Sequence, residues 1–123
     1  MELSETEQLA IRTVVEQQLR AFQANDGARA FSYAAPGIRH QFGSVESFMR
    51  MVESAYQPVY RPRSVMFEGL TWLQSLPTQQ VLLLAENGEL YRAYYVMERQ
   101  PNYEWRIAGC YLASLGDEAA PGQ

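Results

Sequence analysis

The hydrophobic and polar positions divide the chain into a helical first half and a strand-rich second half. From Glu5 to Asn25, apolar residues recur every three or four positions, which is the spacing of one helix face. Ser4 and Glu7 have the spacing of a capping box, in which each side chain accepts a hydrogen bond from the backbone N–H of the other. We therefore predict one continuous helix from Glu5 to Asn25, lying across a sheet formed by the second half. Its apolar stripe consists of Leu3, Ile11, Val15, Leu19 and Phe22.

A second, short helix is predicted from about Gly27 to Ala34. Asp26 is a suitable N-cap for it, because the oxygen of a short side chain at this position accepts a hydrogen bond from a free backbone N–H of the first turn. The dipeptide Pro36-Gly37 is typical of a turn and is expected to end this helix. The connection that follows contains His40.

A third helix is predicted after an N-cap at Ser44. Apolar positions repeat at i, i+3, i+4 and i+7 from Val45 to Tyr56, and Glu46 suits the positive end of the helix dipole. Pro58 and Pro62 cannot continue a helix, so we expect residues 59–61 to be extended.

The second half predicts an antiparallel meander of four strands. Asn87-Gly88 is the strongest short hairpin signal in the chain, because a type I′ turn needs positive φ at both central residues. This turn would place Leu83 opposite Arg92, and the next turn would place Arg99 opposite Glu104. Residues 1–115 then form one domain, and 116–123 are expected to be a flexible tail. The predicted strands cover residues 64–73, 79–86, 89–99 and 104–115.

This register gives the sheet two largely apolar faces. One face contains a polar group within its apolar residues, namely Arg92, Tyr94, Glu98 and Tyr111. The other face contains Tyr91, Tyr95, Met97, Arg106 and Leu112. Three helices cover one face of such a sheet, which leaves the other exposed as an apolar patch. We therefore expect a homodimer through the sheet, with the second set at its centre if the polar group faces the helices.

Composition narrows the possible partners and chemistry. The chain has 123 residues, of which 47% are hydrophobic and 20% charged, as in one ordinary globular domain. A net charge of -4 argues against nucleic acid or an anionic membrane surface as a partner. All 10 basic residues are arginine, which excludes lysine-based Schiff-base chemistry, and one cysteine excludes an internal disulfide. We expect no cofactor and no metal site, since neither a glycine-rich phosphate loop nor a metal-ligand cluster is present.

The cellular location of the protein is predicted from the lack of a signal-peptide pattern and of a membrane-spanning apolar run. The first residues contain Glu2, Glu5 and Glu7 instead of the basic and apolar stretch of a signal peptide. No apolar run approaches the roughly 20 residues that span a bilayer. We therefore expect a cytoplasmic protein without membrane insertion.

Several segments along nearly the whole chain, from about Glu5 to Leu115, resemble a known family. The most specific of them runs from Tyr56 to Ser64, because few families place prolines and arginines in this order after a helix. The others are residues 18–22, 30–38, 42–43, 48–52 and 105–112. The chain is similar to a bacterial family known as domain of unknown function 4864, within the nuclear transport factor two-like superfamily. The resemblance implies an α+β, cystatin-like cone, in which three N-terminal helices pack on a bent four-stranded antiparallel sheet, and it implies no reaction.

Individual residues suggest chemistry, and each also has a structural explanation. His40 could be a general base in the cone, as in some dehydratases of the superfamily, but the carboxylate nearest in sequence, Asp26, is better explained as a helix cap. Cys110 fits a buried hydrophobic residue better than a reactive thiol. Arg61 and Arg63 could hold an anion or pair with glutamates.

We expect a non-catalytic module that binds a small apolar or anionic ligand or a protein partner. The alternative is a small-molecule lyase or isomerase that uses His40 or Glu98 as its base. An open cavity reaching either residue favours the enzyme, and a cone filled by Trp72, Phe67, Tyr33 and Met49 favours an interaction module. The candidate ligand-binding residues are His40, Tyr60, Trp72, Arg92, Tyr94, Glu98 and Tyr111.

Overall fold

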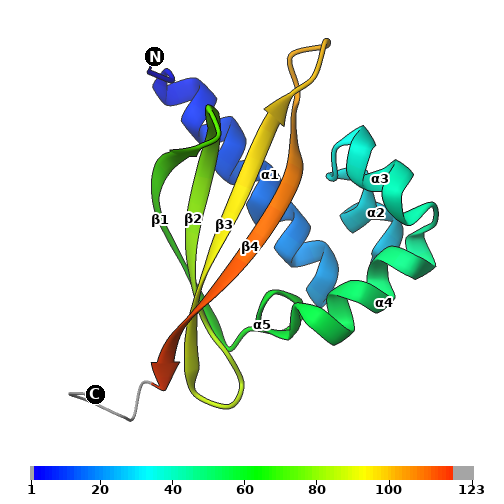
Figure 1. Cartoon of the computed structure of the whole chain (residues 1–123), viewed down its shortest axis with the longest axis vertical. Helices are drawn as coiled ribbons and strands as arrows, with labels where there is room; N and C mark the ends of the chain where they lie inside the picture. Colours follow the sequence, from blue (N-terminus) through cyan, green and yellow to red (C-terminus); the bar gives the residue numbers. More distant parts are fainter. Residues whose placement is uncertain (1, 118–123) are drawn as a thin grey trace.

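Five helices and an open four-stranded antiparallel sheet make up residues 2–117, the part of the chain that the computed structural model describes (Figure 1). The strands follow the order β1-β2-β3-β4. Helix α1 lies across one face of the sheet, and α2, α3 and α4 form a group beside β4 (Figure 1). This α+β architecture is the predicted one and is consistent with a nuclear transport factor two-like cone. The elements are α1 Glu5–Gln23, α2 Gly27–Ser32, α3 Pro36–Phe42, α4 Val45–Ala55, α5 Gln57–Tyr60, β1 Ser64–Leu73, β2 Leu76–Leu84, β3 Glu89–Arg99 and β4 Trp105–Asp117.

Helix α1 confirms the prediction at its start and ends two residues early. Both hydrogen bonds of the capping box between Ser4 and Glu7 are present. The helix ends at Gln23 because Asn25 takes a positive φ of 55°. There the Asn25 side chain accepts a hydrogen bond from Arg61 at 2.7 Å. The predicted stripe is buried from Ile11 to Phe22, as expected for a helix that covers a sheet.

Two prolines begin helices that the sequence analysis placed as turn and extended chain. Pro36 is the first residue of α3, and Pro58 lies in the first turn of α5. Both positions suit proline. A backbone N–H in the first turn has no acceptor within the helix, so its absence in proline costs no hydrogen bond, and the proline ring fixes φ near the helical value. Gly43, at φ 77°, ends α3 in the left-handed conformation. His40 therefore lies on a helix and not in an irregular connection.

The predicted hairpin register is wrong by one residue. Of the Asn87-Gly88 pair only Gly88 has a positive φ, and the N–H of Ala85 donates to the carbonyl of Glu89 at 2.8 Å. The loop is thus three residues long, and Leu82 pairs with Arg92. The second turn differs in the same way, since Tyr103 has a φ of 71° and Arg99 pairs with Trp105 instead of Glu104.

The corrected register puts Val81 and Leu83 on the same face as Tyr95, and this face, which the prediction had left open as inner or outer, is the inner one. Ala93, Tyr95 and Met97 are at most 1% exposed and pack in the core with the helices. Tyr95 and Met97 therefore cannot lie at the centre of a dimer formed through the uncovered face. Arg92 and Tyr94 alternate with these residues along β3 and lie on the outer face.

A β-bulge completes the inner face of β4. The pairing shifts between Val96 and Met97, so that both Ile107 and Cys110 lie opposite inward-facing residues of β3. The strand continues to Asp117, two residues into the predicted tail. The remainder of that predicted tail, 118–123, lies outside the described residues.

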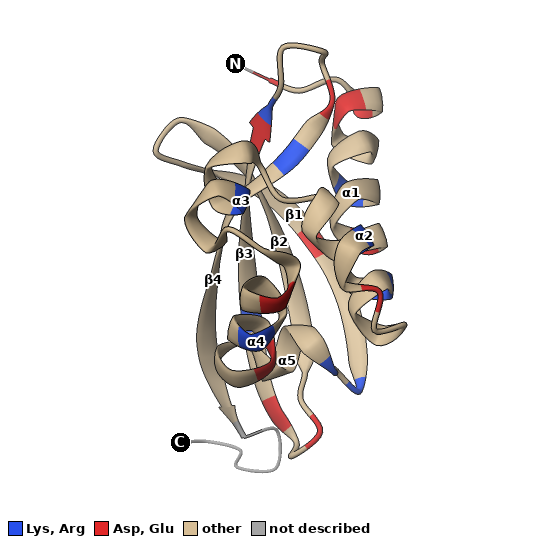
Figure 2. Cartoon of the chain, turned by 90° about the vertical axis from the view of Figure 1, so that its right-hand side faces the viewer, with Lys and Arg blue, Asp and Glu red and all other residues tan. Residues whose placement is uncertain are grey.

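Charged side chains of both signs alternate along α1 and α4 (Figure 2). The described residues contain no helix that is long and apolar enough to cross a membrane.

Candidate functional site

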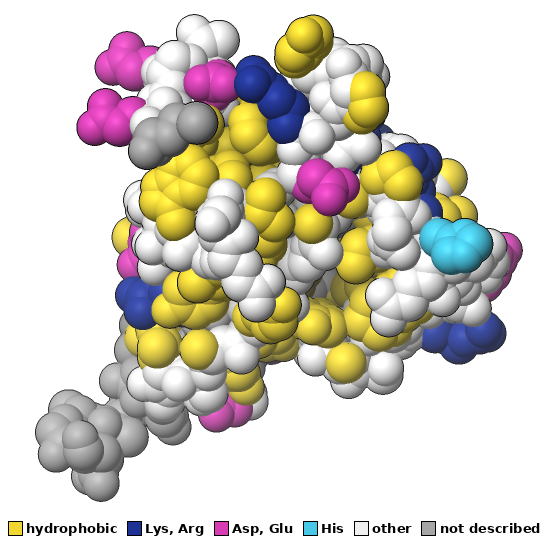
Figure 3. Space-filling model, turned by 45° about the horizontal axis from the view of Figure 1, so that its top comes forward, with side chains coloured by type: hydrophobic (Ala, Val, Ile, Leu, Met, Phe, Trp, Pro, Cys, Tyr) yellow, Lys and Arg dark blue, Asp and Glu magenta, His cyan; other side chains and the backbone are white. Residues whose placement is uncertain are grey.

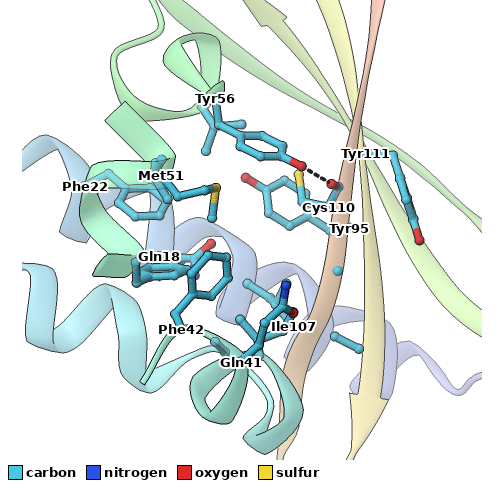
Figure 4. A pocket seen from close by; sticks show the side chains of 17 residues that line it. Gln18, Phe22, Gln41, Phe42, Met51, Tyr56, Tyr95, Ile107, Cys110 and Tyr111 are labelled. Atoms are coloured by element: carbon cyan, nitrogen blue, oxygen red, sulfur yellow. Dashed lines mark hydrogen bonds between the residues drawn. The ribbon is translucent and has the colours of Figure 1, made fainter. Parts of the chain in front are cut away.

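A cavity of about 520 Å³ lies between the inner face of the sheet and the helices. Hydrophobic side chains gather between the sheet and the α2–α4 group on the face shown in Figure 3. Helices α1, α3, α4 and α5 and strands β3 and β4 all contribute to the walls (Figure 4). Most of the wall is apolar, and its largest apolar side chains are Phe22, Ile38, Phe42, Phe48, Met51 and Ile107.

Two sets of contacts fix the position of α2, α3 and α4 and leave the cavity open. At one end, backbone hydrogen bonds join the chain between α2 and α3 to β4. At the other end, aromatic side chains of the helices pack against one another. The N–H of Ala35 donates to the carbonyl of Ile107 at 2.8 Å, and the N–H of Ile107 donates to the carbonyl of Tyr33 at 2.8 Å. On the far side the Phe48 ring packs against the rings of Phe22, Phe31 and Phe42, with centroids 5.1 to 6.1 Å apart. These contacts hold α3 and α4 away from the sheet, and the space between remains open.

The polar groups of the cavity cluster around Tyr95 on β3. The Tyr56 hydroxyl donates to the carbonyl oxygen of Cys110 at 3.0 Å. The amide of Gln18 is also bonded and donates to the carbonyl of Ala30 at 3.0 Å. Tyr95 is 1% exposed, and its hydroxyl has no hydrogen-bond partner among the described residues. It is the only buried side-chain nitrogen or oxygen in this condition within that part of the chain.

Tyr56, Tyr95 and Cys110 of the cavity wall stay protonated at neutral pH. Burial raises the pKa of Tyr95 well above its ordinary value, and burial also raises the pKa of Tyr56. Cys110 is partly exposed as a residue, but its thiol is enclosed, and this burial raises the thiol pKa to about 12. The wall contains no Asp, Glu, His, Lys or Arg among its lining residues. The cavity wall is therefore electrically neutral, and its polar side chains are hydroxyl, thiol and amide groups.

Of the predicted ligand-binding residues, the structure brings Arg92, Tyr94 and Tyr111 together, on the outer face of the sheet, and it leaves the others apart from them. Tyr111 alone lies at this cavity, at its rim on β4, and its side chain points away from the interior (Figure 4). His40 is exposed on α3, as the space-filling view shows (Figure 3). Trp72 is 44% exposed near the end of β1, and Glu98 is exposed near the end of β3. The Tyr60 hydroxyl donates to the Asn25 side chain at 2.8 Å and helps to end α1.

Two of the arginines named in the sequence analysis, Arg92 and Arg61, have structural partners. Arg92 forms two hydrogen bonds with Glu68 on the outer face, at 2.7 and 3.1 Å, and Tyr94 lies beside them. This pairing raises the pKa of Arg92 and lowers that of Glu68. Arg61 donates to the carbonyl of Phe22 and to Asn25, and not to a glutamate. Neither arginine reaches the cavity.

Sequence reasoning missed the groups that give the cavity its polarity, namely Gln18, Tyr56 and Tyr95. Tyr95 was not a candidate because the predicted pocket residues of the sheet were taken from the Arg92 face, whereas the inner face is the one that contains Tyr95. Gln18 carried a usable signal, since it is a polar residue within the predicted apolar stripe of α1, and it is 4% exposed. The described residues also hold no group of three or more His, Cys, Asp and Glu side chains placed to bind a metal ion.

Comparison with known proteins gives one match. No curated protein and no solved structure is similar enough to be matched to the chain. A family model matches residues 4–120, which include every element that forms the cavity. The chain therefore belongs to the family described as Domain of unknown function (DUF4864).

Proposed function

We propose that this protein is a non-catalytic module that binds a small, uncharged, mostly apolar molecule in the cavity between the helices and the sheet. The observation that supports this is the wall itself, which is mainly apolar and aromatic and contains no ionised side chain. Small-molecule pockets typically measure about 300–1,000 Å³ and combine such walls with a few polar groups. The cavity of about 520 Å³ falls within this range.

The absence of charge in the wall separates the two predicted ligand classes. A carboxylate or phosphate loses its hydration on entering an apolar cavity, and only a cation or several donors would replace it. Arg92 is bound to Glu68 on the other face of the sheet and is not available for this. The cavity therefore favours the apolar ligand over the anionic one.

The same wall argues against the lyase or isomerase alternative. Neither His40 nor Glu98 lines the cavity, so neither is placed to remove a proton from a molecule bound there. The Cys110 thiol, with a pKa of about 12, is a poor nucleophile at neutral pH. Binding without catalysis needs none of these groups.

Equilibrium dialysis against the neutral hydrocarbon 2-ethylnaphthalene tests the proposal. The wild-type protein should bind it saturably with one site per chain. The substitution Met51→Trp fills the cavity and should abolish binding, since Met51 projects into the interior (Figure 4). Met66→Trp is the matched control, because Met66 is 62% exposed on β1 and lies outside this cavity. Equal binding by the wild type and Met51→Trp would contradict the proposal.

We also propose that the protein is a homodimer through the outer face of the sheet. No helix covers this face within the described residues, and it presents Met66 and Tyr111, which are 62% and 59% exposed. Leu82 and Tyr94 lie between them on β2 and β3. A twofold contact would bury this surface against its own copy and leave the cavity accessible.

A further inference from the structure

We infer that the ligand has an accepting oxygen, such as a carbonyl, which receives a hydrogen bond from the hydroxyl of Tyr95. This inference rests on the proposed function, and it adds that the apolar ligand also contains one polar group, a hydrogen-bond acceptor. It makes Tyr95 a ligand-binding residue and assigns the ligand to uncharged carbonyl compounds with an apolar body.

The position of Tyr95 is the first argument. It lies in the middle of β3, directly opposite Cys110 on β4, and its side chain enters the cavity from the sheet (Figure 4). The hydroxyl points toward the space enclosed by Tyr56 and Met51 (Figure 4). Tyr95 lines the cavity, and its hydroxyl oxygen is covered in the ligand-free structure, so an acceptor on a ligand contacts this oxygen once a covering side chain moves aside.

The missing partner is the second argument. More than about 90% of buried polar groups in native proteins are hydrogen-bonded, and each exception asks for an explanation. The other polar groups nearby are satisfied, since Tyr56 donates to Cys110 and Gln18 to Ala30. A phenylalanine would fill the same space without a buried, unpaired hydroxyl. A bound acceptor explains why a tyrosine stands here.

The neighbouring groups limit what the partner is. The Cys110 thiol beside Tyr95 is a weak hydrogen-bond acceptor and leaves the hydroxyl free for a better one. Tyr95 keeps its proton because burial holds its pKa far above neutral, so it acts as a donor. A carbonyl oxygen accepts this proton and brings no charge or further donor into the apolar wall. A carboxylate would accept it too but would enter without a cation to pair with.

Two matched probes test the inference by equilibrium dialysis. The probe 2-acetylnaphthalene differs from 2-ethylnaphthalene by a carbonyl in place of a methylene. We measure both dissociation constants for the wild type, for Tyr95→Phe and for Tyr56→Phe. Tyr95→Phe should weaken binding of the acetyl probe by about tenfold, the worth of one good neutral hydrogen bond, without weakening the ethyl probe. Tyr56→Phe, which removes a hydroxyl that is already bonded, should leave the ratio of the two constants unchanged.

The outcomes separate the inference from the proposed function. An unchanged ratio in Tyr95→Phe, with the ethyl probe still bound, overturns the inference and leaves the proposed function standing. Failure of both probes to bind the wild type overturns both. The infrared carbonyl stretch of the acetyl probe, labelled with ¹³C and bound to the wild type, decides the question without a variant. A frequency below that of the probe in cyclohexane supports the hydrogen bond, and the same frequency as in cyclohexane overturns it.

Discussion

Replacing Tyr95 by phenylalanine should make the ligand-free protein more stable, which is the opposite of the usual result for a change in a packed core. The ring, which is 1% exposed, keeps its contacts in the variant. What disappears is a buried hydroxyl without a partner, and leaving such a group unpaired costs about 1–3 kcal/mol. Loss of its weak contact with the Cys110 thiol offsets part of this gain. We expect a net increase of about 1 kcal/mol in the free energy of unfolding, or about 3–5 °C in Tm for a chain of this length.

The partnered hydroxyl of the same cavity provides the control. Tyr56→Phe removes the 3.0 Å hydrogen bond to the carbonyl of Cys110 and should cost about 1 kcal/mol. Urea denaturation followed by circular dichroism measures both variants against the wild type. Opposite signs for the two tyrosines would support the reasoning. A loss of more than about 0.5 kcal/mol in Tyr95→Phe would refute it, because the hydroxyl would then have a partner in the free protein.

Four further predictions follow from other parts of the molecule. Leu19→Ala should lower the free energy of unfolding by about 2–5 kcal/mol, because Leu19 lies on the buried side of α1 and is 4% exposed, and a loss below about 0.5 kcal/mol would place the helix elsewhere. The pKa of Glu68 is lowered from its ordinary 4.5 by Arg92, so the stability from this pair is complete above that pH and is lost as the pH falls through the lowered value. The unfolding free energies of the wild type and Glu68→Gln should therefore differ near neutral pH and converge in acid, and parallel profiles would exclude the effect. Cys110, with a pKa of about 12, should react with iodoacetamide at pH ~8 far more slowly than free cysteine does, whereas a rate equal to that of free cysteine would mean an exposed thiolate. Sedimentation equilibrium should give twice the chain mass of 14.0 kDa, and the single-chain mass at micromolar concentration would rule out the dimer.

The sequence was sufficient to predict those elements whose local residue pattern is compatible with only one structure. The capping box of Ser4 and Glu7, the N-cap Ser44 and the bounds of β1 and β3 are all present as predicted. Pro36 and Pro58 had two meanings, because proline both ends a helix and suits the first turn of the next one. The residues that follow decided between them, and each began a short helix.

The site depended on a feature that local sequence does not determine. Asn-Gly supports both a two-residue loop and a three-residue loop, and the two differ only in whether Asn87 joins Gly88 at positive φ. This one-residue difference moves every side chain of β3 to the other face relative to the side chains of β2. Both faces are apolar enough to be buried, so the hydrophobic pattern did not reject the wrong register. The prediction left the inner face open and took its candidate residues from the Arg92 face, so it did not include Tyr95, the central polar group of the cavity.

Methionine methyl NMR tests most directly whether the cavity binds an uncharged apolar molecule. Met51 lines the cavity, Met66 is 62% exposed on the outer face, and Met97 is buried away from the cavity wall, so the chain contains both the reporter and its controls. The protein is labelled with ¹³C at the methionine methyl groups and titrated with 2-ethylnaphthalene. The ring current of the bound naphthalene should shift the Met51 signal saturably and leave Met66 in place. An unmoved Met51 signal, or a shift confined to Met66, would contradict the proposed binding site.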